Sequence, residues 1–214
     1  MGRRALRDNV SGIDLSRHLK SFEQLPSPWD SAGLFGRRAP LEVEVGSGKG
    51  LFMTAASAAQ PERDFLGIEM AAKYARFAAG RLARLGRENA VMVSGDALRV
   101  FRELLPDGSL AAVHVYFPDP WWKARHRKRR VMNAAFARDI ERTLEPRGRL
   151  HFWTDVEEYF ETTLVLLAET TKLSGPLAVS QRDAEHDLDY RTHFERRTRL
   201  HGEHVYRAQF ERAI

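Results

Sequence analysis

Cysteine is absent from the 214 residues of this chain. Without thiols the protein has no disulfide bonds, cysteine-ligated zinc, iron–sulfur clusters or thiol nucleophiles. Long apolar runs are lacking too. The longest, residues 110–117, contains a histidine and is far shorter than the roughly 18 residues of a membrane span. No apolar stretch follows the first arginines, so we expect no signal peptide, no membrane partner and a cytoplasmic location.

The composition is that of a globular protein with a basic balance. Hydrophobic residues make up 43% and charged residues 29% of the chain, and the net charge is +5. The length suits one α/β domain. A basic surplus favours polyanionic partners such as nucleic acid, although mild basicity alone is weak support.

Strand and helix patterns alternate five times from residue 41 onwards. Strands are expected at 41–45, 65–68, 90–94, 110–117 and 149–154, and helices in the intervals and at 155–172, with Pro146 and Gly148 ending the helix before the fifth strand. The tail is expected to form an extended pair with a long loop between, ending on 205–210. This alternation predicts an α/β, Rossmann-like fold with a mainly parallel, doubly wound sheet and an antiparallel C-terminal strand. Residues 1–40 are rich in Arg, Pro and Gly, so we expect a basic N-terminal arm that could be mobile, followed by one domain over 41–214.

Acidic side chains stand at the ends of all five predicted strands. They are Glu44, Glu69, Asp96, Asp119 and Asp155. In doubly wound sheets ligands bind beyond the carboxyl ends of the strands, so these acids are expected near one site.

A glycine loop, Gly46-Ser-Gly-Lys-Gly50, follows the first strand. It lacks both the Gly-x-Gly-x-x-Gly dinucleotide fingerprint and the Lys-Ser/Thr pair of a P-loop. Glu69 lies 19 residues after Gly50, a spacing typical of the acid that holds ribose hydroxyls. Glu44 would repel a pyrophosphate but suits the cationic sulfonium and ammonium of S-adenosylmethionine (SAM), whereas Lys49 argues mildly the other way.

Each of these residues also has a purely structural interpretation. Asp96 and Asp155 could be helix N-caps, Glu44 a solvated strand residue, and Gly48 and Gly50 aids to helix packing. Acids at all five strand ends favour a nucleoside-bearing cofactor over these separate explanations.

Asp119 lies between two prolines in Phe117-Pro-Asp-Pro-Trp121, after the most apolar strand. The prolines restrict the backbone, and the neighbouring aromatic rings could stack on a base while the carboxylate accepts hydrogen bonds from its edge. A basic run over 123–130 follows directly. Such a run beside an active-site loop favours binding of nucleic-acid phosphates over a merely solvated face.

Over residues 40–212 the chain resembles the bacterial tRNA (guanine-N7)-methyltransferases of the TrmB type, which are class I SAM-dependent enzymes. The most specific motif is Phe117-Pro-Asp-Pro-Trp121 with the basic run after it. The other matching segments are Glu44-Val-Gly-Ser-Gly48, Phe65-Leu-Gly-Ile-Glu69, Gly95-Asp-Ala97, Thr154-Asp155 and Thr192-His-Phe-Glu195.

The resemblance implies roles for individual residues. SAM would be held by Glu44, Gly46, Gly48, Glu69, Asp96 and Ala97. Asp119 would be catalytic. The substrate would be held by Lys123, Asp155, Thr192, His193, Phe194 and Glu195, and RNA by Arg125, His126, Arg127, Lys128, Arg129 and Arg130. Trp122 and His193 depart from the residues common in this family.

The implied reaction is methyl transfer from SAM to N7 of a guanine in the tRNA variable loop. Guanine N7 carries an in-plane lone pair and no proton, so the reaction needs alignment and tolerance of a cationic product rather than a base or a metal. The sequence leaves open how Asp119, Asp155 and Glu195 divide these roles, and whether the protein is a monomer or a homodimer. Alternatives are a class I methyltransferase acting on another position or base of RNA, a non-catalytic RNA-binding module, and an NAD-linked oxidoreductase.

Overall fold

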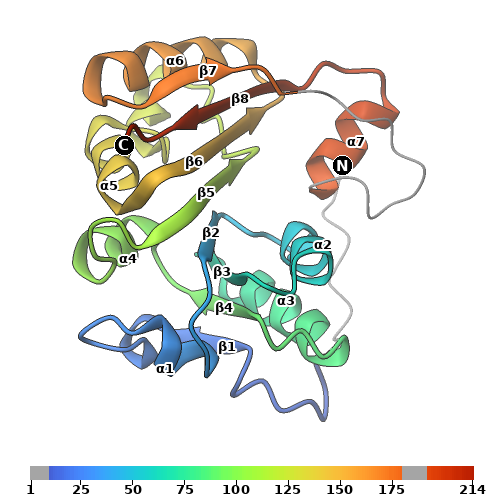
Figure 1. Ribbon diagram of the computed structural model, residues 1–214. Helices are drawn as coiled ribbons and strands as arrows, with labels where there is room; N and C mark the ends of the chain where they lie inside the picture. Colours follow the sequence, from blue (N-terminus) through green and yellow to red (C-terminus); the bar gives the residue numbers. More distant parts are fainter. Residues whose placement is uncertain (1–9, 180–191) are drawn as a thin grey trace.

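The computed structural model describes residues 10–179 and 192–214, which form an eight-stranded sheet between two layers of helices (Figure 1). From one edge to the other the strands are β1 (Leu19–Ser21), β4 (Ala90–Ser94), β3 (Asp64–Glu69), β2 (Leu41–Val45), β5 (Leu110–Tyr116), β6 (Leu144–Thr154), β8 (Tyr206–Glu211) and β7 (Ser174–Leu177). The first six strands are parallel, and β8 is antiparallel to both of its neighbours. The predicted doubly wound sheet with an antiparallel C-terminal strand is confirmed.

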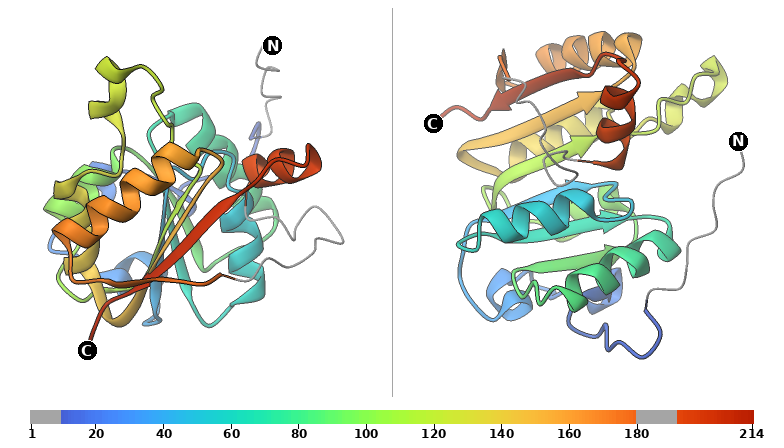
Figure 2. Two further views of the ribbon diagram at one scale, coloured as in Figure 1. Left: turned by 90° about the horizontal axis from the view of Figure 1, so that it is seen from above. Right: turned by 90° about the vertical axis from the view of Figure 1, so that its right-hand side faces the viewer.

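Two helices, α2 (Leu51–Ala59) and α3 (Ala72–Arg84), cover one face of the sheet (Figure 2). The other face carries α4 (Ala97–Glu103), α5 (Ala134–Thr143) and α6 (Glu157–Thr170). The chain winds outward from β2 in both directions, so the switch point lies between β2 and β5. This is where doubly wound sheets bind their ligands.

Strand β6 begins earlier than the sequence pattern indicates. Leu144 already pairs with Leu110, and the register shifts before Arg149 pairs with Ala112. The irregular stretch contains Pro146 and Gly148, which the pattern assigned to the end of the preceding helix.

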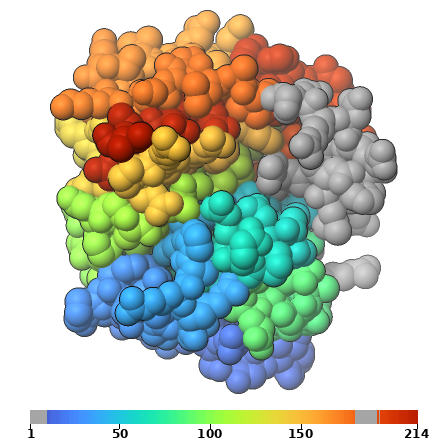
Figure 3. Space-filling view, in the orientation of Figure 1, coloured from blue at the N-terminus to red at the C-terminus, as the bar shows by residue number. Residues whose placement is uncertain are grey.

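Residues 10–40, which the sequence pattern sets apart as an arm, pack on the sheet. They contribute β1, a 3-10 helix η1 (Phe22–Gln24) and α1 (Ser31–Phe35), and bury Val10 and Leu15. The space-filling view shows this segment, in blue, at the lower end of the molecule (Figure 3).

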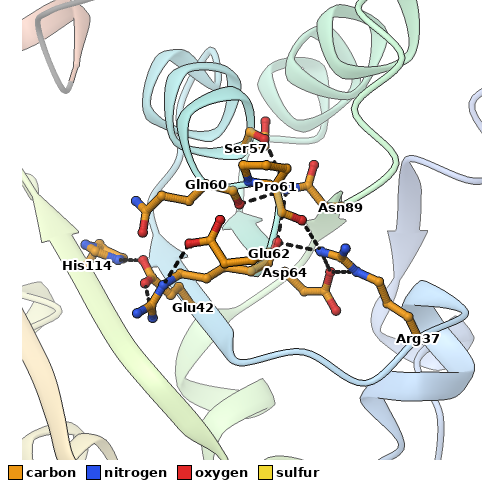
Figure 4. A network of polar contacts seen from close by, with 10 residues as sticks. Arg37, Glu42, Ser57, Gln60, Pro61, Glu62, Asp64, Asn89 and His114 are labelled. Atoms are coloured by element: carbon orange, nitrogen blue, oxygen red, sulfur yellow. Dashed lines mark hydrogen bonds and ion pairs between the residues drawn. The ribbon is translucent and has the colours of Figure 1, made fainter.

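A polar network at the amino-terminal ends of β2 and β3 ties this segment to the domain (Figure 4). Arg37 donates to Asp64 Oδ1 at 2.8 Å and to Pro61 O at 2.7 Å. Close by, Asn89 Nδ2 donates to Ser57 O, near the end of the preceding helix, and to Gln60 O and Arg63 O in the turn before β3. The network lies at the opposite end of β2 from the glycine loop, which leaves the carboxyl edge of the sheet for a ligand.

The tail contains one element that its sequence pattern did not reveal. Helix α7 (His193–Leu200) lies in the stretch expected to be a loop between β7 and β8. In the described ranges, 10–179 and 192–214, every helix falls short of the length and apolarity that a membrane span needs.

Candidate active site

A cavity of about 870 Å³ opens at the carboxyl ends of β2, β3, β4 and β5. Four of the five strand-end acids line it: Glu44, Glu69, Asp96 and Asp119. The other predicted residues in its wall are Gly46, Gly48, Ala97, Arg129, Thr192 and Phe194. Lys123, Asp155 and Glu195 are not part of the wall.

The glycine loop is fastened to the end of β3. The backbone N–H of Gly46 donates to Ile68 O at 2.8 Å, and that of Gly48 donates to Glu69 Oε2 at 2.8 Å. The second carboxylate oxygen of Glu69 accepts from Ala71 N at 2.8 Å. These bonds fix the orientation of the Glu69 carboxylate in the cavity wall.

Glu44 is buried rather than solvated, with 2% of its surface exposed. In the described part of the chain its Oε2 atom has no hydrogen-bond partner. Burial raises the pKa of Glu44 to about 8, and the neighbouring charge of Glu69 acts in the same direction. An unpartnered buried acid in a cavity wall is suited to a cationic ligand, since such a ligand would supply the missing interactions.

Asp96 fits both of its interpretations, as a helix N-cap and as a residue of the ligand site. Its Oδ1 atom caps α4 by accepting from Leu98 N at 2.9 Å, and the exposed side chain also lines the cavity. Asp155 is exposed and does not cap α6, because the N-cap residue there is Val156.

The loop that carries Asp119 has a strained backbone at both ends. Phe117 and Trp121 have φ angles of 50° and 46°, a region that residues other than glycine rarely adopt. Within the described residues the exposed Asp119 carboxylate has no hydrogen-bond or ion-pair partner, so it remains available to a ligand.

Arg130 does not belong to the exposed part of the basic run. It is buried, its Nε donates to Pro120 O at 2.8 Å, and its two terminal nitrogens lie 3.2 and 2.6 Å from the Glu158 carboxylate oxygens. The guanidinium also lies 4.4 Å from the ring centre of Tyr159. This geometry does not fit the predicted RNA contact, because the side chain is committed to holding the Asp119 loop against α6.

The remaining cations of the run lie on a short 3-10 helix, η2 (Ala124–Arg129), that projects from the body of the protein (Figure 2, yellow-green). Arg125, Lys128 and Arg129 are exposed, as is Lys123 just before the helix. Arg129 lies 5.2 Å from the Trp121 ring centre and lines the cavity. The run therefore reaches the cavity through Arg129, while its other exposed cations extend into solvent.

Helix α7 contributes the far wall of the cavity. Its N-cap residue Thr192 accepts a hydrogen bond from Glu195 N at 3.0 Å, and Phe194 stacks on Phe117 with 6.3 Å between ring centres. Glu195 is buried and ion-paired with Arg207 at 3.1 Å, so it anchors the helix to β8. The side chain of His193, predicted to touch substrate, lies outside the described residues.

Two groups of cavity residues carried no signal in the sequence. Tyr116 lines the cavity, and its hydroxyl lies 2.8 Å from His114 Nδ1, while His114 Nε2 lies 2.8 Å from Glu42 Oε2. Arg197 lines it from α7, 5.1 Å from the Phe194 ring centre. His114 looks like an ordinary strand residue in the sequence, and Arg197 falls in a segment whose pattern indicates a loop.

Solved structures share the fold at low sequence identity. A 16S rRNA (adenine(1408)-N(1))-methyltransferase of Catenulisporales acidiphilia, in a mutant form with cosubstrate SAM, has a TM-score of 0.57 at 17% identity, over 86% of this chain and 90% of that one. The aminoglycoside-resistance methyltransferase NpmB1 has a TM-score of 0.55 at 19% identity, over 84% and 90%.

Sequence comparisons are more specific. A family model described as "Putative methyltransferase" matches residues 38–208. The tRNA (guanine-N(7)-)-methyltransferase of Rhodopirellula baltica is 51% identical over 99% of this chain and 80% of its own length. The protein of the same name from Aeromonas hydrophila is 34% identical over 95% and 82%. This chain therefore belongs to the tRNA (guanine-N7)-methyltransferase family.

Proposed function

We propose that this protein transfers a methyl group from SAM to N7 of a guanine in the variable loop of tRNA, giving 7-methylguanosine. The observation that carries the proposal is that acids from four strand ends meet in one cavity, in a chain 51% identical to an enzyme of that name.

The cavity wall fits the chemical groups of SAM. The unpartnered Oε2 of Glu44 suits the ammonium group, and the fixed Glu69 carboxylate suits the ribose hydroxyls. Asp96 and Ala97, at the end of β4, suit the adenine, and Gly46 and Gly48 keep the wall beside the methionine part free of side chains. Because the strand order is β4-β3-β2-β5, this arrangement turns the methionine end toward the Asp119 loop.

SAM, when bound, supplies an activated methyl group on a sulfonium. The chain's own residues align guanine N7 with it between the Asp119 loop and α7. Asp119 stabilises the positive charge that develops on the purine, or accepts from its N1–H and N2–H. Thr192 and Phe194 contact the base from the opposite wall, and the buried Glu195, paired with Arg207, holds α7 in place there. Lys123 and Asp155, which lie outside the cavity wall, complete the substrate side together with His193.

The tRNA is held by the projecting part of the basic run, Arg125, His126, Arg127, Lys128 and Arg129, which lies next to the base-binding side of the cavity. Lys and Arg contacts to phosphates position a nucleic acid without reading its sequence. We further propose that the protein acts in the cytoplasm, as a monomer or a homodimer.

The test uses methyl-labelled SAM and tRNA, followed by nucleoside analysis. We expect 7-methylguanosine, and cleavage of the product RNA at one variable-loop position by borohydride and aniline. A tRNA with 7-deazaguanine at that position keeps its Watson–Crick edge but has carbon in place of N7, so it should bind and receive no methyl group. Methylation of the deaza substrate would instead assign the enzyme to an exocyclic amino group or another base position.

A further inference from the structure

Helix α3 carries basic charge and no acidic residue. Its charged side chains are Lys73, Arg76, Arg81 and Arg84. At 100° per residue they fall within an arc of about 140°, opposite the buried alanines and Leu82. The helix therefore presents a face that carries four cations and no acid, with the half-buried Phe77 among them, which we call the α3 basic face.

None of these four cations is paired with a carboxylate in the part of the chain that the structure describes. Some exposed arginines elsewhere are paired, such as Arg102 with Glu103 at 2.9 Å and Arg149 with Glu211 at 3.3 Å. Like charges three and four residues apart repel one another, so an unbalanced row on a helix destabilises it slightly. A polyanion that binds the row would remove this repulsion.

The α3 basic face begins at the cavity. Ala71 and Tyr74 line the cavity wall, and Lys73 Nζ lies 5.2 Å from the Tyr74 ring centre. About two turns further on, Arg81 Nη1 approaches the backbone oxygen of Lys49 in the glycine loop at 3.5 Å. Helix α3 follows β3, whereas the basic run follows β5, and β2 lies between these strands. Cationic surfaces thus flank the cavity on both sides.

We propose that the α3 basic face binds the phosphate backbone of the tRNA on the side of the cavity opposite the basic run. This inference rests on the proposed function and extends it with a second binding surface. Two separated surfaces would fix the orientation of the tRNA over the cavity, which a single projecting helix cannot do.

The experiment compares two doubly substituted full-length proteins of equal charge. Arg76→Gln with Arg84→Gln removes unpaired cations of the α3 basic face, and Arg102→Gln with Arg149→Gln removes paired arginines elsewhere. Binding to unmodified tRNA is measured across a salt series. The slope of log affinity against log salt should become shallower in the α3 variant, by up to about 0.9 for each phosphate that the protein no longer neutralises. In the control the slope should stay at the wild-type value.

Lys128→Gln, in the basic run, is the reference for a side chain that binds phosphate, and SAM calorimetry reports that each variant is folded. An unchanged slope in the α3 variant, or an equal change in both double variants, overturns the inference. Loss of binding to anionic phospholipid vesicles with unchanged tRNA affinity also overturns it and assigns the face to a membrane surface. If the wild-type protein methylates no tRNA, the proposed function fails instead.

Discussion

At the scale of single residues, Asp119 is an exposed carboxylate with no hydrogen-bond or ion-pair partner among the described residues, held between two strained positions. We expect Asp119→Ala to lose about 10²–10³ in turnover, the scale of one preorganised electrostatic group, with SAM affinity nearly unchanged. Single-turnover methylation and calorimetry measure the two quantities. Asp119→Asn serves as the isosteric comparison, and turnover within a few-fold of wild type in both variants would refute the role.

Arg130 holds the Asp119 loop in place, because it donates to Pro120 O and is paired with Glu158 of α6. The Asp119 charge contributes to the high pKa of Tyr159, which burial raises to about 12, so the loop, Tyr159 and Arg130 are electrostatically connected. Since small displacements of reacting groups are costly, we expect Arg130→Ala to lower kcat by roughly 10–10²-fold. The slope of log tRNA affinity against log salt should stay at the wild-type value. Glu158→Gln keeps one hydrogen bond to Arg130, so it should lower kcat less than Arg130→Ala does. A shallower slope with normal kcat would restore Arg130 to the RNA-binding residues.

Glu44 makes stability depend on pH. Its pKa is about 8 in the folded protein, above the ordinary value of 4.5, so the folded state retains a proton that the unfolded chain releases. Its contribution to the free energy of unfolding is complete below pH 4.5 and is lost as pH rises through about 8. Urea unfolding without SAM measures the free energy of unfolding at pH 5 and at pH 9. Between these two pH values it should fall less in Glu44→Gln than in wild type, by on the order of a few kcal/mol. Equal losses in the two proteins would contradict the buried, protonated state.

At the scale of elements, the packing of α2 against α3 depends on a glycine. Gly50 has a φ of 68°, and an added Cβ would lie 2.7 Å from the Cβ of Ala78. Gly36 has a φ of 75° and open space around it, so it is the matched control. We expect Gly36→Ala to destabilise by about 1–2 kcal/mol through backbone strain alone, and Gly50→Ala by about 1–3 kcal/mol more through overpacking. Urea unfolding measures both, and equal values would show that α3 moves away at no cost.

At the scale of the whole molecule, we expect residues 10–40 to unfold together with the rest of the protein, because they contribute to its core. Leu15 is 7% exposed and packs in the same apolar cluster as Phe52 and Phe65. We therefore expect Leu15→Ala to cost about 2–4 kcal/mol in the free energy of unfolding, like other core truncations. Leu85→Ala, at a site 48% exposed, should change it by less than about 0.5 kcal/mol. Two separate unfolding transitions in the wild-type protein would instead show that residues 10–40 unfold independently of the rest.

The sequence by itself determined the succession of central strands and helices along the chain, and it placed the strand-end acids near one site. The apolar runs, the glycine loop and the acid after each strand are local patterns, and the parallel topology follows from their alternation. Four acids from separate segments meet in one cavity because the carboxyl ends of parallel strands share an edge of the sheet.

Only the tertiary structure decided which charged residues are buried and which are exposed. Arg130 and the other cations of its run look alike in the sequence, yet Arg130 is buried against Glu158 and Tyr159, 28 and 29 positions further on. Glu44 looks like one member of an alternating strand, but a central parallel strand is covered on both faces, so the acid is buried and its pKa rises. Burial depends on neighbours that are distant in the chain, and a local pattern of residues carries no information about them.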